Sequence, residues 1–119
     1  RTGRLGEPVG FVSAAEVLSH NANLCAAGRY SFLQDPPGVG PGKLFTRQQR
    51  SEILEANRRM NGGRLRCDET GLYLSDEAGS AYSAEVDHIV PKSRGGTNSY
   101  SNARVVSRSV NRRKGNRYP

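Results

Sequence analysis

The last third of the chain concentrates the residue types that hydrolysis of a phosphodiester requires. An acid and a histidine are adjacent at Asp87 and His88, and two spaced asparagines, Asn102 and Asn111, precede a closing basic run. A neutral imidazole titrates near physiological pH and can take a proton from water. A carboxylate and an amide oxygen are hard ligands, which suit Mg²⁺ or Mn²⁺ better than zinc. The segment therefore predicts a metal-dependent nuclease.

Short elements have to bring these four side chains together. The sequence predicts a strand over residues 84–90, a polar loop over 92–101, a second strand over 103–107 and a basic helix over 108–117. Successive residues of a strand point to opposite faces, so Asp87 and His88 reach a site from different directions unless a bulge re-aims them.

A further helix is predicted to begin at Thr46, upstream of the motif. Thr46 with Gln49 matches a capping box, and the pair at residues 62–63, both glycine, supplies a stop. Within this helix, Glu55 can pair with Arg59 one turn later. Residues 64–67 and 72–74 are expected to form short strands around a turn.

The first part of the chain has weaker patterning. One short helix is predicted over residues 13–20, and a Pro/Gly-rich stretch over 35–42 is neither helix nor central strand. We expect an N-terminal arm over residues 1–45 and a catalytic core over 46–119, with the motif over 85–117. The chain begins at Arg1 without methionine or a secretory apolar segment, so we expect an excised or processed fragment.

Composition narrows the class of protein. The chain has 119 residues, 34% of them hydrophobic and none of them Trp, which predicts one domain with a small core. Its net charge of +7 favours a polyanionic partner, although a membrane surface or an acidic protein fits charge alone. No apolar run is long enough to span a bilayer. Cys25 and Cys67 could form one disulfide or remain two thiols, and their number excludes a four-cysteine zinc site.

The segment from residue 87 to 96, with Asn102 and residues 111–115, resembles the ββα-metal core of HNH endonucleases. The distances along the chain from His88 to Asn102 and to Asn111 are similar to those in the HNH domain of CRISPR effector nucleases, where the third motif position is also Asn. The resemblance implies an α+β fold, in which a small ββα-metal (HNH, or His-Me finger) core follows a helix and an irregular Gly/Pro-rich arm. For residues 1–45 we recognise no resemblance to a family.

The resemblance also implies a role for each motif residue. His88 would be the general base, and Asn102 would pin the intervening loop and orient His88, so both are catalytic candidates. Asp87 and Asn111 would be the protein ligands of one divalent cation, with Mg²⁺ favoured and Mn²⁺ also open, and Glu85 is a candidate auxiliary group. Six basic residues are the candidates for phosphate contact: Arg94, Arg108, Arg112, Arg113, Lys114 and Arg117.

The chain departs from the family pattern at its zinc knuckle. Many HNH domains carry two CxxC pairs that hold a structural zinc, but here the first is reduced to Cys67 with Thr70 and the second to Ser107 with Val110. We therefore expect no structural zinc. Stability is expected to come from apolar contacts among Leu65, Leu72, Leu74, Val86, Ile89, Val105 and Val106.

Among HNH proteins, the chain resembles the C-terminal nuclease domains of bacterial polymorphic toxins in its size and in having the motif near its end. This resemblance implies an antibacterial effector that cuts DNA with little sequence specificity. It further implies secretion or delivery by a bacterial secretion system, action in the target-cell cytoplasm, and an acidic immunity protein as partner. Two alternatives stay open: a ribonuclease toxin, and a non-catalytic nucleic-acid-binding module with an HNH fold. Nicking and double-strand cutting are also both open.

Overall fold

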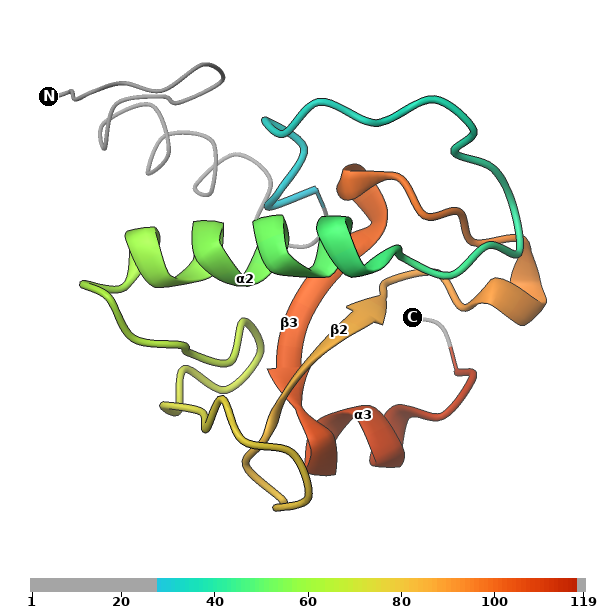
Figure 1. Cartoon of the computed structure of the whole chain (residues 1–119). Coiled ribbons are helices and arrows are strands. Elements are labelled where there is room, and N and C mark those ends of the chain that lie inside the picture. The colour runs from blue at the N-terminus through green and yellow to red at the C-terminus, as the bar shows by residue number, and fades with distance from the viewer. Residues whose placement is uncertain (1–27, 118–119) are drawn as a thin grey trace, which may run out of the picture.

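The computed structural model describes residues 28–117, which fold as a small α+β unit (Figure 1). Its regular elements are helix α2 (Arg47–Met60), strand β2 (Ala84–His88), strand β3 (Ala103–Ser107) and helix α3 (Arg108–Lys114). Helix α2 lies across the sheet, whereas α3 follows β3 directly and packs against both strands. No helix among the described residues is long and apolar enough to cross a membrane. The predicted helix over 13–20 and Cys25 lie outside the described residues.

Strands β2 and β3 form an antiparallel pair in which His88 faces Ala103 and Asp87 faces Arg104. The first strand was predicted to reach residue 90 but ends at His88. Ile89 N still donates to the carbonyl of Asn102, its partner in register, but the following amide, Val90 N, leaves the ladder and donates to the Asn102 side chain. The strand therefore stops where the catalytic candidate sits, and a loop with two 3-10 turns, Lys92–Arg94 and Tyr100–Asn102, takes over.

Helix α2 forms as the sequence predicts. The Thr46 side chain accepts from Gln49 N, and the Gln49 side chain accepts from Thr46 N, which completes the capping box. Glu55 and Arg59 pair at 3.2 Å. The helix ends at Met60, and the glycines at positions 62 and 63 follow with φ of 68° and 96°, conformations that L side chains rarely adopt.

The predicted strands over 64–67 and 72–74 reduce to a hairpin with one isolated bridge, Arg66 to Tyr73. Backbone hydrogen bonds from Cys67 N to Leu72 O (2.8 Å) and from Leu74 N to Leu65 O (2.9 Å) hold it together. The prediction that Leu72 belongs to the core is wrong, because its side chain is 56% exposed. The ladder is too short to give Leu72 a neighbouring strand to pack against.

The main core lies between α2, the sheet and the segment that precedes α2. Its fully buried side chains include Tyr30, Ile53, Tyr100 and Val105. Val106, also predicted for the core, belongs to a smaller cluster with Cys67 and with Val110 of α3. Strand β3 therefore contributes to two small cores, one shared with α2 and the other shared with α3.

Residues 35–45 form a strap that runs along the loop after β2 (Figure 1). Pro41 bridges to Thr97, and Gly42 N donates to Gly96 O at 2.9 Å. The strap ends at Phe45, which is buried. The described part of the predicted N-terminal arm thus packs on the core, while the domain boundary at residue 45 stays a prediction.

Candidate active site

His88 is held at the end of β2 with its ring nearly buried. Its Nε2 lies 2.8 Å from the main-chain carbonyl of Lys43, and its ring centroid lies 4.4 Å from that of Phe45. A carbonyl can only accept a hydrogen bond, so Nε2 carries the proton of the neutral ring. The other nitrogen, Nδ1, is then the one that can accept a proton from elsewhere.

Burial lowers the pKa of His88, because an imidazolium loses hydration there. The Lys43 carbonyl and Asp87 act in the opposite direction, and Lys92 and Lys114 lower the pKa further. The net direction is downward from an ordinary value of 6.5, so the ring is predominantly neutral at pH 7. This protonation state is the one that a general base requires.

The strap places the Lys43 carbonyl, and Asn98 fixes the strap. The Asn98 side chain accepts a hydrogen bond from Gly40 N at 3.0 Å and donates one to Leu44 O at 3.3 Å. It therefore binds the strap on both sides of Lys43. Gln49 of α2 donates in turn to Asn98 O at 2.7 Å. Sequence reasoning missed this use of the Pro/Gly-rich stretch. Neither its composition nor its spacing identified the carbonyl that meets His88.

Asn102 ties both ends of the loop that follows His88. Its side chain accepts from Val90 N at 2.8 Å and donates to Val90 O at 3.1 Å and to Thr97 O at 2.9 Å. The loop is tight, since a Cβ at Gly96 would lie 1.7 Å from Val90 O. This geometry suits the loop-pinning role that the sequence predicts for Asn102, which stays a prediction.

Asp87 is paired with two cations. Its Oδ2 lies 3.1 Å from Arg104 Nε and 3.2 Å from Lys114 Nζ, with only 10% of its side chain exposed. The Lys114 ammonium also donates to the main-chain carbonyl of His88 at 2.8 Å. Lys114 was predicted to contact substrate phosphate, yet here it bridges the acid and the histidine of the motif. Its placement follows from α3 folding back over β2, which the spacing alone did not reveal.

Asn111 faces the same side of β2 one turn earlier in α3. Its Nδ2 donates to Glu85 Oε1 at 2.8 Å, and Glu85 lies two residues before Asp87 and so on the same strand face. Asp87, Asn111 and Glu85 therefore line one seam between β2 and α3. Within residues 28–117 there is no group of three or more His, Cys, Asp and Glu side chains that could hold a metal ion. A cation in this seam would rely on few protein oxygens.

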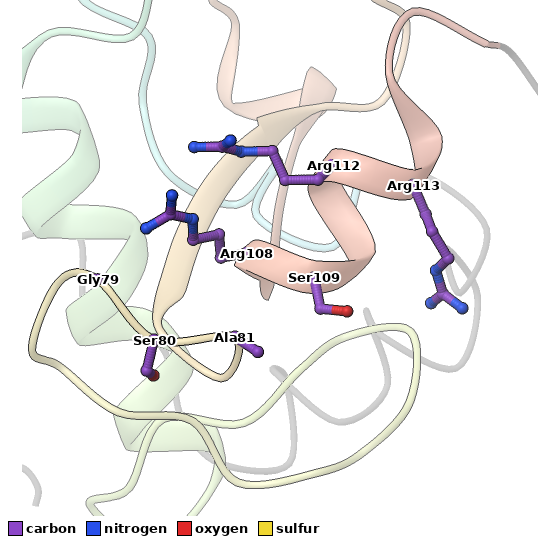
Figure 2. A pocket seen from close by; sticks show the side chains of 7 residues that line it. All are labelled: Gly79, Ser80, Ala81, Arg108, Ser109, Arg112 and Arg113. Carbon is purple, nitrogen blue, oxygen red and sulfur yellow. The ribbon is translucent and has the colours of Figure 1, made fainter.

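The structure separates the remaining basic candidates into two groups. Arg94 Nε donates to Asn116 O at 3.1 Å, and Arg117 donates to the carbonyls of Lys114 and Arg113, so Arg94 and Arg117 support the end of α3. The other group lines a groove beside α3 and comprises Arg108, Arg112 and Arg113 (Figure 2).

Comparison with known proteins agrees with this arrangement. A family model described as HNH endonuclease matches residues 70–119, a range that contains both strands, α3 and all four motif residues. No curated protein and no solved structure matches the chain. The antiparallel β2–β3 pair followed by α3 is the ββα arrangement of that family. Residues 70–119 of this chain are therefore an HNH endonuclease domain.

Proposed function

We propose that the chain is a metal-dependent endonuclease that hydrolyses DNA phosphodiester bonds with little sequence specificity. The observation that carries the proposal is the hydrogen bond from His88 Nε2 to the Lys43 carbonyl at 2.8 Å. It fixes the ring and leaves Nδ1 as the proton acceptor. Together with the lowered pKa, it supports His88 as the base that deprotonates the attacking water, a contribution of roughly 10²–10⁴-fold to the rate.

Two further contacts support His88 in that role. His88 is the last residue of β2 that pairs with β3, and the Asn102 side chain forms hydrogen bonds with Val90 N and Thr97 O in the loop that follows. Lys114 donates to the His88 carbonyl, which fixes the main chain on the side facing α3. The ring is thus restrained through its own nitrogen and through the backbone on which it is carried, so little reorganisation precedes proton transfer.

The donor set of the seam fits a hard divalent cation. Asp87 and Asn111 offer a carboxylate and an amide oxygen, and Glu85 adds a second carboxylate, all preferred by Mg²⁺ and Mn²⁺. When bound, such a cation stabilises negative charge on the phosphate and on the leaving oxygen. Contacts within the chain position these oxygens: Asn111 donates a hydrogen bond to Glu85, and Asp87 forms ion pairs with Arg104 and Lys114.

DNA is the proposed substrate because the charge of the chain suits a duplex. The net charge is +7, and phosphate contacts release condensed counterions whatever the base sequence. Such contacts position a duplex without reading it, which supports limited specificity.

We further propose that the domain serves as an antibacterial effector of the polymorphic-toxin type, delivered by a secretion system into the cytoplasm of a target cell. The producing cell would then need an inhibitor. A basic nuclease surface favours an acidic immunity protein, since complementary charge speeds association.

Supercoiled plasmid, incubated with the purified chain, tests the proposed chemistry. We expect nicked, linear and degraded DNA with Mg²⁺, no cleavage with EDTA, and no cleavage by His88→Ala in Mg²⁺. The matched control is His20→Ala, which removes the other histidine of the chain and is expected to retain activity. Induced expression in a bacterial cytoplasm should likewise arrest growth for the native chain but not for His88→Ala.

Two results would contradict the proposal. Intact plasmid beside degraded RNA would make the chain a ribonuclease. Salt-sensitive DNA binding without cleavage of either substrate would leave a binding module that keeps the motif without its chemistry.

A further inference from the structure

An open groove lies between helix α3 and the loop at residues 79–81, beside the seam that holds Asn111. Its volume is about 490 Å³, and its lining consists of Gly79, Ser80, Ala81, Arg108, Ser109, Arg112 and Arg113. Figure 2 shows the guanidinium groups of Arg108 and Arg112 extending on the same side of α3, with Ser80 and Ala81 on the facing loop. Three arginines and two hydroxyls give the groove the chemistry of an anion site.

The positive charge of this groove is not neutralised within the described part of the chain. Arg104, Arg58 and Arg59 each have a carboxylate within ion-pair distance, whereas none of the three groove arginines has one among residues 28–117. Arg108 and Arg112 are also four residues apart on a helix, a spacing at which like charges destabilise the helix. An anion between the two would remove that repulsion.

The groove is built before any ligand arrives. Ser109 N donates to Ala81 O at 3.1 Å, and Arg108 N donates to Ser83 O at 2.9 Å, so the loop is fastened to the start of α3. The Ser83 hydroxyl donates to Glu77 O at 2.6 Å and accepts from Ser80 N at 2.9 Å, which fixes the loop from within. A preformed loop costs little ordering entropy when a ligand binds.

We propose that this groove binds a phosphodiester of the substrate that flanks the one being cleaved, and that the loop at residues 79–81 is therefore a substrate-binding element. The inference rests on the proposed function and adds a binding site to it. Helix α3 turns Asn111 and Lys114 towards β2 and carries Arg108 and Arg112 on the adjoining side. A nucleic-acid strand with one phosphate at the seam therefore brings its neighbouring phosphates to the groove.

Binding without cleavage tests the groove separately from catalysis. Fluorescence anisotropy of a short labelled duplex is measured in EDTA across a range of salt concentrations. The variant Arg108→Gln/Arg112→Gln is expected to bind about 10- to 100-fold more weakly and to lower the slope of log K against log salt by roughly 2. The control Arg47→Gln/Arg64→Gln removes the same charge from exposed positions outside the groove, and its slope should change by less than about 1.

A second variant protects the test against misfolding. Ser109→Glu places a carboxylate in the groove at the first turn of α3, where an acid is favourable, and four residues before Arg113, where it can form an ion pair. We expect its melting temperature to be equal to or above that of the native chain, and its affinity for DNA to fall about tenfold or more. In Mg²⁺, both groove variants should raise KM while leaving kcat within about twofold of the native value.

The outcomes separate the two proposals. Native affinity and native salt slope in both groove variants would overturn the groove, whether or not the native chain cleaves plasmid. Loss of affinity for poly-glutamate without loss of affinity for DNA would also overturn it, since the groove would then be a surface for an acidic protein. Weaker DNA binding by the groove variants, beside a native chain that binds but does not cleave, would support the groove and refute the nuclease.

Discussion

Replacing Asn102 by alanine tests how the loop after His88 holds the site. The change removes three side-chain hydrogen bonds, one from Val90 N and two to the carbonyls of Val90 and Thr97. It also removes the bond to the carbonyl of Thr97, the residue before Asn98, whose side chain bonds to the strap that carries the Lys43 carbonyl. His88 therefore loses support from the backbone and from its Nε2 partner together.

The magnitude follows from the number of bonds. Each hydrogen bond is worth about 0.5–1.5 kcal/mol net, so the loss of three lowers the free energy of unfolding by about 1.5–4.5 kcal/mol. Asn102→Asp keeps the shape and the acceptor for Val90 N but faces two carbonyl oxygens that it cannot satisfy at pH 8. We therefore expect Asn102→Asp to lose at least as much stability as Asn102→Ala. A displacement of His88 by about 1 Å lowers the rate on the order of 100-fold.

Urea unfolding of the three proteins, with plasmid cleavage under conditions where all are folded, measures both effects. Stability within about 0.5 kcal/mol of the native chain for both variants would show that these bonds do not hold the loop. Loss of stability with native activity after correction for the folded fraction would refute the coupling of Asn102 to His88.

Two further predictions concern charge at the site. Because the folded-state pKa of His88 is lowered, the neutral ring stabilises the fold fully above the unfolded value of about 6.5, and this contribution is lost as pH falls through the folded-state pKa. The acidic limb of kcat/KM against pH should accordingly have its midpoint below about 6.5, and a midpoint above 7 would contradict the assignment. Lys114→Met removes the ammonium 3.2 Å from Asp87 Oδ2, a cation that competes with a divalent ion for the same carboxylate. The Mg²⁺ concentration that gives half of the maximal thermal stabilisation should therefore fall several-fold, and an unchanged or higher requirement would show that Lys114 does not compete.

The sequence predicted the elements whose signals are local. The capping box at Thr46, the helix that it begins, and the strand over residues 103–107 all depend on neighbouring residues, and all appear in the structure. Leu72 was assigned wrongly because burial depends on what lies opposite, and the hairpin is too short to provide it.

The contacts within the site were harder to predict, because they join distant segments through main-chain atoms. The Lys43 carbonyl reaches His88 across 45 positions of sequence, and a carbonyl has no residue type that a motif could single out. Lys114 belonged to a basic run that resembles a solvated surface. Only the packing of α3 on β2 turns its ammonium inward, to Asp87 and to the His88 carbonyl.

Within each of the two residue pairs that the resemblance aligns with the zinc knuckle of HNH domains, a hydrogen bond joins the two members. Thr70 N donates to Cys67 Sγ at 3.4 Å, and Val110 N donates to Ser107 Oγ at 3.0 Å. Beside them, the buried carboxylate of Asp68 links the hairpin to other segments.

Asp68 Oδ2 accepts from Val105 N of β3 at 2.7 Å and from the Tyr30 hydroxyl at 2.7 Å. One carboxylate therefore fastens the hairpin both to the sheet and to the segment before the strap. Burial raises the pKa of Asp68, which means that these donors, with Arg29 at 3.4 Å, have to offset a desolvation cost. Asp68 therefore ties the hairpin to the sheet without drawing on the Asp87 carboxylate that the proposed cation would use.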